Sequence, residues 1–187
     1  MSLASNERAH KRVLGLPPAL TGGPFLPQHF VPSVLHIPAD WLLTHGYRAV
    51  LLDLDNTLLP RDCDAIPPDI LAWAHGLTAA GLRCCLLSNN WHARVSAAAE
   101  ELGFALVSKA VKPLPFAFLL ALHRLQARRR EAVMIGDQLY TDMLGAAVLG
   151  IGTIMVQPLS DYDLAHTLFL RKLERFTMGS RVPEPLC

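Results

Sequence analysis

Residues 51 to 60 read LLDLDNTLLP, an apolar run interrupted by two aspartates, Asp53 and Asp55. A short apolar run of this kind is typical of a buried parallel strand, and ligands in open α/β sheets bind just beyond the carboxyl ends of such strands. Two carboxylates at that place repel each other unless a cation or a proton compensates their charge. The stretch therefore predicts a metal ion beside Asp53. An isolated Asp-x-Asp-x-Thr is equally typical of a loop that simply ends a strand.

The sequence on both sides of this stretch alternates between short apolar runs and helical patterns. Strands are expected over residues 49–54, 83–90, 104–107, 132–137 and 152–157. Helices are expected over residues 38–46, 67–81, 91–103, 111–126 and 138–150, several of them opened by proline or closed by glycine. Alternation this regular predicts crossover units and a parallel sheet covered on both faces, which is a three-layer α/β/α fold.

The two ends of the chain differ from this pattern. Prolines recur too often in residues 1–38 for long helices, so we expect an irregular leader that packs on the sheet. Residues 160–176 read as a helix whose basic side chains include Arg171, Lys172 and Arg175. That pattern fits a helix covering the sheet, and also a peripheral contact with a membrane surface. Residues 178–187 are expected to be a loose tail, which leaves residues 39–177 as the α/β domain.

Composition narrows the class of protein. A chain of 187 residues with 51% hydrophobic and 18% charged residues can bury one good core, so one domain is expected. The formal net charge of +1 offers no basic field, and no nucleic-acid partner is expected. Four cysteines without a Cys-x-x-Cys pair indicate free thiols in a reducing compartment. Without a signal peptide or an apolar run of roughly 18 residues, a cytoplasmic protein is expected.

Polar side chains occur at the ends of the predicted strands. The carboxyl ends of parallel strands meet at one edge, so Asp53, Asp55, Ser88, Lys112 and Asp137 are expected to line one crevice. Phosphoryl transfer needs an oxygen nucleophile in line, charge compensation for the equatorial oxygens, and a proton donor for the leaving group. This set of residues supplies each part.

The residue types suggest a division of roles within the crevice. Asp53 is the expected nucleophile, and Asp55 is the expected acid and base that protonates the leaving group. Asp137, Asp53 and the main-chain carbonyl of Asp55 would bind Mg²⁺ through oxygen, the ligand atom that this ion prefers. Lys112 would neutralise the phosphoryl group, and Ser88 would hydrogen-bond it together with neighbouring backbone N–H groups.

Four segments of the chain resemble the four motifs of the haloacid dehalogenase (HAD) superfamily of phosphatases. They are DLDNT at 53–57, LLSNN at 86–90, the pair Lys112–Pro113, and GDQLYTD at 136–142. The segments FLPQHFVPSVLHI and Arg94–Val95 bring the match closer to the YqeG-like branch, which is similar to phosphatidylglycerophosphate phosphatases. The resemblance covers residues from about 25 to 175. It implies a Rossmann-like HAD fold, phosphatase activity, Mg²⁺ as cofactor, and the roles given above.

The resemblance also bears on four neighbouring residues. Asp142 matches the second acid of the fourth motif, which more often orients other groups than binds the metal. Asn89, next to Ser88, is a candidate substrate contact, although a loop hydrogen bond explains it equally well. Lys109 is a rival for the lysine role, but only Lys112 has the matching proline. Pro115 departs from the glycine expected at that position.

The spacing of the motifs bears on the substrate. The links from Asp53 to Ser88 and from Ser88 to Lys112 are each just long enough for a loop, a helix and a strand, since a crossover takes at least about 10–12 residues plus its strands. No large cap domain fits, so the chain resembles the capless subclass III. An open crevice favours a phosphate carried by something large or embedded in a membrane, and the resemblance implies phosphatidylglycerophosphate. A soluble nucleotide or sugar phosphate, and a non-catalytic interaction protein, are the alternatives.

Overall fold

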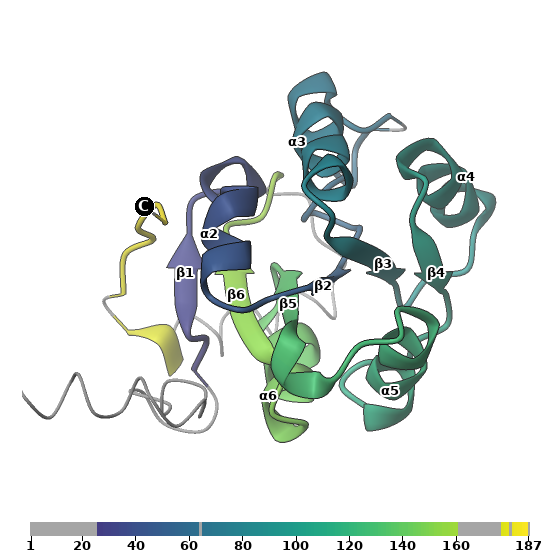
Figure 1. Cartoon of the computed structure of the whole chain (residues 1–187). Helices are drawn as coiled ribbons and strands as arrows, with labels where there is room; N and C mark the ends of the chain where they lie inside the picture. Colours follow the sequence, from purple (N-terminus) through teal and green to yellow (C-terminus); the bar gives the residue numbers. More distant parts are fainter. Residues whose placement is uncertain (1–25, 64, 161–176, 180, 187) are drawn as a thin grey trace, which may run out of the picture.

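A single parallel sheet of six strands forms the centre of the computed structural model, which describes residues 26–63, 65–160, 177–179 and 181–186 (Figure 1). The strand order is β1-β6-β5-β2-β3-β4, and every neighbouring pair is parallel. The strands are β1 (His29–Val31), β2 (Ala49–Leu52), β3 (Arg83–Leu87), β4 (Ala105–Val107), β5 (Ala132–Gly136) and β6 (Gly152–Val156). Five of them were predicted, whereas β1 lies in the segment that was expected to be irregular.

Helices cover both faces of the sheet, which confirms the three-layer prediction (Figure 1). One face carries α2 (Ala39–Thr44), α3 (Pro68–Ala79) and α4 (Ala93–Leu102). The other carries α5 (Pro115–Arg124) and α6 (Leu144–Val148), the latter preceded by the π-helical turn η3 (Leu139–Met143). Short 3₁₀ turns form η1 (Val34–His36) and η2 (Arg129–Glu131). The helix predicted over residues 160–176 lies outside the described residues, except for Ser160.

Side chains that alternate along the strands create two apolar cores, one on each face of the sheet. Val50 and Leu52 of β2 belong to the core under α2, α3 and α4, while Leu51 belongs to the core under α5 and α6. This alternation follows from the period of two along a strand. It also separates the adjacent residues Cys84 and Cys85, which lie in different cores and are both free thiols.

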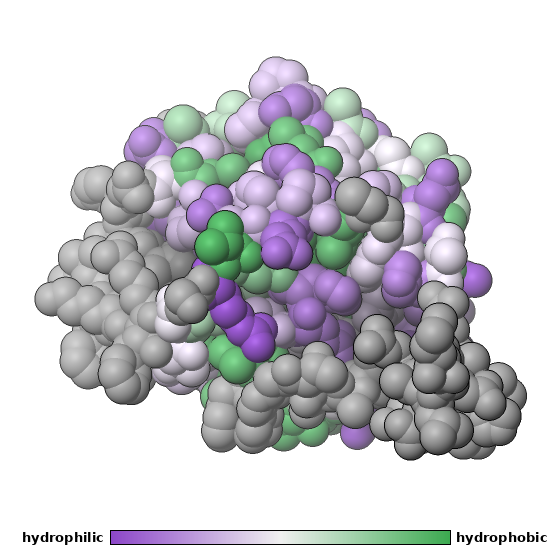
Figure 2. Space-filling view, turned by 90° about the vertical axis from the view of Figure 1, so that its left-hand side faces the viewer, coloured by the Kyte–Doolittle hydropathy of each residue, from purple (hydrophilic) through white to green (hydrophobic). Residues whose placement is uncertain are grey.

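The β1 edge of the sheet is covered by the end of the described chain. The backbone N–H of Glu184 donates to the carbonyl of Phe30 at 2.8 Å, and that of Leu186 donates to His36 at 3.2 Å. Leu186 also packs against the core under α2 and α3. The prediction of a loose tail is therefore wrong for these residues, because backbone pairing and an apolar contact hold them. Figure 2 faces this edge, where hydrophilic and hydrophobic residues are interspersed outside the grey regions.

No helix in the described part of the chain has both the length and the apolar character needed to cross a membrane.

Candidate active site

Three neighbouring strands bring the predicted site residues to one edge of the sheet. Asp53 directly follows β2, Ser88 follows β3 and Asp137 follows β5. The sheet pairing continues into this edge, since the N–H of Asp53 donates to the carbonyl of Ile135 at 3.0 Å. The convergence predicted from the strand ends is therefore present. It arises because β2 lies between β5 and β3 in the sheet.

A buried lysine joins two of the carboxylates. Lys112 Nζ lies 2.6 Å from Asp53 Oδ1 and 2.7 Å from Asp142 Oδ1, and all three side chains are buried. Thr57 Oγ1 donates to the other oxygen of Asp53 at 3.3 Å. Lys109 instead lies on the surface, with Nζ 5.3 Å from the centre of the Trp91 ring. Lys112 is thus the lysine at the site.

Burial and charge act in opposite directions on this ion pair. Burial is the largest influence on Asp53 and raises its pKa to about 6; Asp142 and Asp55 add to the rise, and Lys112 opposes it. Burial lowers the pKa of Lys112, but the negative charges of Asp142 and Asp53 outweigh burial and raise it. Lys112 therefore stays protonated, whereas an ionised Asp53 needs further positive charge nearby.

The carboxylates of Asp53, Asp137 and Asp142 form a group that could hold a metal ion. They offer one oxygen each within 4.8 Å of one another, and all three side chains are buried. Three ionised carboxylates and one ammonium leave a formal charge of −2, which a divalent cation would cancel. An all-oxygen donor set of this kind suits a hard divalent cation. The residues present therefore fit such an ion.

Asp142 and Asp55 differ in their relation to this group. Asp142 contacts Lys112 through Oδ1 and accepts from the N–H of Gln138 through Oδ2 at 3.2 Å. These contacts agree with the orienting role that the resemblance implied. The carboxylate of Asp55 lies outside the group, and metal binding by its main-chain carbonyl stays a prediction.

The segment after β3 contacts Asp55 through a residue that the sequence reasoning missed. Asn90 Nδ2 donates to Asp55 Oδ2 at 2.7 Å, while its backbone N–H donates to Ser88 Oγ at 3.1 Å. The only signal in the sequence was the second asparagine of LLSNN. Asn90 thereby links the predicted acid and base to the predicted phosphate contact, Ser88, which is completely buried.

Asn89 holds the backbone that carries the lysine. Its Oδ1 accepts from the N–H of Lys112 at 2.7 Å, and its Nδ2 donates to the Lys112 carbonyl at 3.4 Å. This geometry is that of the loop hydrogen bond considered as the alternative role for Asn89. A direct contact with substrate stays a prediction. Just before Lys112, Lys109 and Val111 both adopt positive φ angles of 52°, a conformation that is costly outside glycine and often found near functional sites.

Two further residues, Arg94 and Gly136, help to position the site without belonging to the group of carboxylates. Arg94 donates to the carbonyls of Pro60 at 2.5 Å and Arg61 at 3.3 Å, so it braces the loop after Asp55. Gly136 leaves room for Asp142, since a Cβ there would lie 2.5 Å from Asp142 Oδ2. The constraint on this glycine could be read from the structure alone.

Comparison with known proteins agrees with this geometry. The family model described as HAD-hydrolase-like matches residues 110–158. The chain is 36% identical over 151 residues to "Probable phosphatase YqeG" of Bacillus subtilis, covering 81% of this chain and 88% of that protein. The chain belongs to the HAD superfamily and is a phosphatase of the YqeG type.

Solved structures show the same fold. A HAD phosphatase from Thermococcus onnurineus superposes with a TM-score of 0.53 at 18% identity, covering 72% of this chain and all of that one. The cobalt-bound deoxy-D-mannose-octulosonate 8-phosphate phosphatase of Haemophilus influenzae gives a TM-score of 0.53 at 13% identity, covering 74% and 90%. At these identities the likeness concerns the fold alone.

The capless form predicted for this HAD phosphatase is also present. Among the described residues, α3 is the only helix or strand between β2 and β3, and α4 is the only one between β3 and β4. No helix or strand is inserted there beyond those of the crossovers. No cap domain is therefore inserted after Asp53 or after Ser88 within the described part of the chain.

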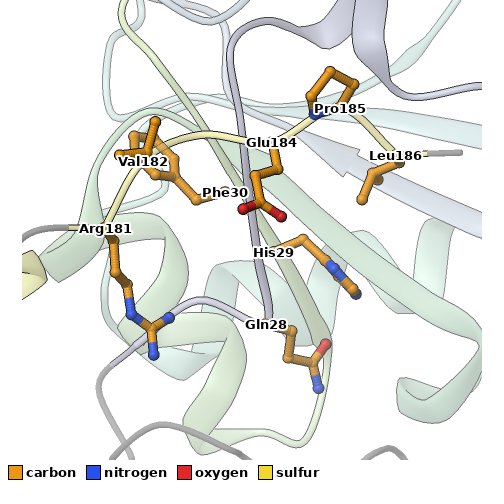
Figure 3. Close-up of a pocket in the computed structure, with 8 residues that line it drawn as sticks. All are labelled: Gln28, His29, Phe30, Arg181, Val182, Glu184, Pro185 and Leu186. Carbon is orange, nitrogen blue, oxygen red and sulfur yellow. The ribbon is translucent and has the colours of Figure 1, made fainter.

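One cavity of the HAD phosphatase lies elsewhere. Residues of β1 and of the segment 181–186 line a cavity of about 350 Å³, and Figure 3 shows their side chains. Its lining includes none of the carboxylates of the active site.

Proposed function

We propose that this HAD phosphatase is a Mg²⁺-dependent phosphomonoester hydrolase that forms an aspartyl-phosphate on Asp53, with phosphatidylglycerophosphate as its substrate. One observation carries the catalytic part of the proposal: the contact of Asp53 with Lys112 inside a buried group of carboxylates. A nucleophile held against a cation, with room for a second cation, can approach a phosphoryl group that carries negative charge.

In the first step, an oxygen of Asp53 attacks phosphorus and the bond from phosphorus to the ester oxygen breaks. Asp55 gives its proton to that departing oxygen, so the alcohol leaves neutral. In the second step, water attacks the phosphorus, Asp55 takes a proton from the water, and the bond to Asp53 breaks. Inorganic phosphate leaves, and Asp53 regains its carboxylate. Asn90 would hold Asp55 at the correct angle throughout, through the 2.7 Å hydrogen bond.

The cationic groups of the site compensate charge during both steps. Lys112 is close enough to Asp53 Oδ1, at 2.6 Å, to contact a phosphoryl group transferred to that residue. Ser88 and the neighbouring N–H groups would hydrogen-bond the remaining oxygens. Mg²⁺ bound by Asp53 and Asp137 would supply the positive charge that lets a buried Asp53 stay ionised. This role agrees with the effect of burial on the pKa of Asp53.

Two features support a lipid substrate, and one supports a soluble substrate. The YqeG-type sequence resembles phosphatidylglycerophosphate phosphatases, and the crevice has no cap domain among the described residues. On the other side, the chain is 38% identical over 64 residues to the "Ribulose-1,5-bisphosphate 5-phosphatase" of Halopiger xanaduensis, although that match covers only 27% of the relative. A soluble sugar phosphate is therefore the second candidate.

A phosphate-release panel tests both parts of the proposal. The substrates are phosphatidylglycerophosphate in detergent micelles, ribulose bisphosphate and nucleoside monophosphates, each with Mg²⁺ and with a chelator. Asp53→Asn is expected to lose at least about a thousandfold in kcat, since it removes the nucleophile. Asp40→Asn, which neutralises an exposed aspartate on α2, is the matched control and should keep full activity.

The panel separates the outcomes clearly. Activity that survives Asp53→Asn would show that another residue is the nucleophile. Activity that persists in the presence of the chelator would contradict the proposed requirement for Mg²⁺. A wild-type enzyme that hydrolyses the soluble phosphates but not the micellar lipid would replace the lipid with the second candidate.

A further inference from the structure

Large apolar side chains are exposed mainly in one part of the described chain. Eight such residues are exposed, and five of them occur at position 91 or between positions 111 and 119. Phe116 is 73% exposed and Trp91 is 61% exposed. Soluble proteins rarely group large apolar side chains on the surface without an interaction that covers them. We call this group the rim patch; it consists of Trp91, Val111, Leu114, Phe116 and Leu119.

The rim patch belongs to two loops that hydrogen bonds hold together. The N–H of Lys109 donates to the carbonyl of Asn90 at 3.3 Å, and that of Ala110 donates to Ser88 at 3.0 Å. The side-chain amide of Asn89 hydrogen-bonds to both the N–H and the carbonyl of Lys112. The loop after β3, which contains Trp91, and the loop before α5 are therefore one connected surface.

This surface adjoins the active site. Val111 and Leu114 stand on either side of the Lys112–Pro113 pair, whose lysine reaches inward to Asp53. Trp91 follows Asn90, whose side chain reaches inward to Asp55. In both loops, a polar side chain contacts an aspartate of the active site, while the apolar side chains next to it are exposed. Phe116 and Leu119, three residues apart on α5, extend the patch along one face of that helix.

The patch also carries a cation. Lys109 is exposed, and its ammonium lies over the Trp91 ring at 5.3 Å from the ring centre. An exposed tryptophan, several large apolar side chains and a lysine beside the tryptophan form the combination that suits an anionic bilayer surface.

We propose that the rim patch inserts into the surface of a bilayer containing anionic lipids and so places the active-site crevice at the level of the lipid headgroups. This inference rests on the proposed function, because a phosphate at the membrane surface is what such docking would present to Asp53. Lys109 supplies the attraction to negative charge, and the apolar side chains supply the insertion. The rim patch therefore binds the lipid surface itself. If the rim patch bound a protein partner and not vesicles, the proposal would be contradicted.

Co-sedimentation of the full chain with phosphatidylcholine vesicles, with and without phosphatidylglycerol, tests the docking. The double variant Trp91→Ser with Phe116→Ser should weaken binding at least about tenfold, because two large apolar groups no longer leave water. The double variant Val148→Ser with Val182→Ser, at two exposed valines outside the patch, is the matched control and should bind like wild type. Lys109→Gln should weaken binding about fivefold, and only to the vesicles with phosphatidylglycerol.

A spectroscopic measurement identifies the residue that enters the bilayer. Brominated acyl chains should quench the fluorescence of the wild-type protein. Trp91→Phe should lose that quenching but keep most of the binding, because phenylalanine preserves the apolar contact. Quenching that persists in Trp91→Phe would show that a different surface inserts.

The docking and the proposed function fail in different ways. If wild type does not sediment with vesicles, or if the rim variant sediments equally well, docking is overturned even when micellar phosphatidylglycerophosphate is hydrolysed. If the rim patch mediates binding to vesicles but no phosphate is released from that lipid in micelles, docking stands and the proposed substrate is wrong. The rim variant should also keep the wild-type shift in Tm when Mg²⁺ is added, since none of its substitutions reaches the carboxylates.

Discussion

The hydrogen bond from Asn90 to Asp55 joins a loop residue to the group that is expected to move protons. Asn90→Ala removes a partner of a carboxylate, and hydrogen bonds to charged groups contribute about 1.5–3 kcal/mol. We expect kcat to fall about ten- to a hundredfold with little change in KM, because the loss affects orientation and not substrate binding. Steady-state kinetics on the preferred substrate measure this split. A rise in KM alone would mean that Asn90 contacts the substrate instead.

Asp53 should destabilise the protein when no metal is bound. Its pKa in the folded protein, about 6, lies above the 3.8 of an unperturbed aspartate, chiefly because it is buried. A raised pKa favours folding while the group is protonated, and that contribution is lost as the pH rises through about 6. With a chelator present, Asp53→Asn should therefore melt higher than wild type at pH 8, and the difference should shrink toward pH 4. A variant that melts lower at pH 8 would show that the contact with Lys112 outweighs burial.

How far the sequence predicts the site depends on the kind of contact. Asp53, Ser88 and Asp137 could be placed because each follows an apolar strand, and parallel strand ends meet. The contact of Asn90 with Asp55 could not, since it depends on how two loops approach each other. The packing of Gly136 against Asp142 likewise depends on a side-chain direction that no spacing encodes.

At the scale of elements, α5 and α6 meet at a glycine. A Cβ at Gly145 would lie 2.5 Å from the Phe118 ring and 3.0 Å from the Pro113 carbonyl. Gly145→Ala should therefore destabilise the protein by about 1–3 kcal/mol, measured by urea unfolding. Gly76→Ala in α3 is the matched control, because a Cβ there meets nothing within 4 Å. It should be neutral or stabilise the protein by up to about 1 kcal/mol. Equal effects of the two variants would contradict this account of the helix contact.

The elements themselves were more predictable than their ends. The period of the apolar residues predicted five strands and the helices between them. It missed β1, because a strand of three residues among prolines gives no periodic signal. It started α5 too early, because Val111 and Leu114 are apolar but belong to the loop that carries Lys112. β1 forms because it pairs with β6, which lies far away in the sequence. α5 begins later than predicted because the residues before it form the loop that places Lys112 in the site.

At the scale of the whole molecule, the buried carboxylates should couple metal binding to stability. Mg²⁺ at a hundred times its Kd would stabilise the folded state by about 2.7 kcal/mol, which corresponds to roughly 5–10 °C in Tm for a chain of this size. Asp137→Asn should lose most of that shift, whereas Asp40→Asn should keep it. Differential scanning fluorimetry with and without a chelator measures the effect. An unchanged Tm in the wild-type protein would argue against a resident divalent ion.

The position of β2 between β5 and β3 has a consequence for the synthesis of this protein. The nucleophile is made early, but its neighbours Lys112, Asp137 and Asp142 come from much later in the chain. A ribosome must therefore release the chain beyond position 142 before all of these groups can meet. Until then the nascent chain carries Asp53 at an unpaired strand edge, where slow, non-local pairing is open to wrong partners. The active site is thus complete only once β5 and the turn η3 that follows it have docked beside β2.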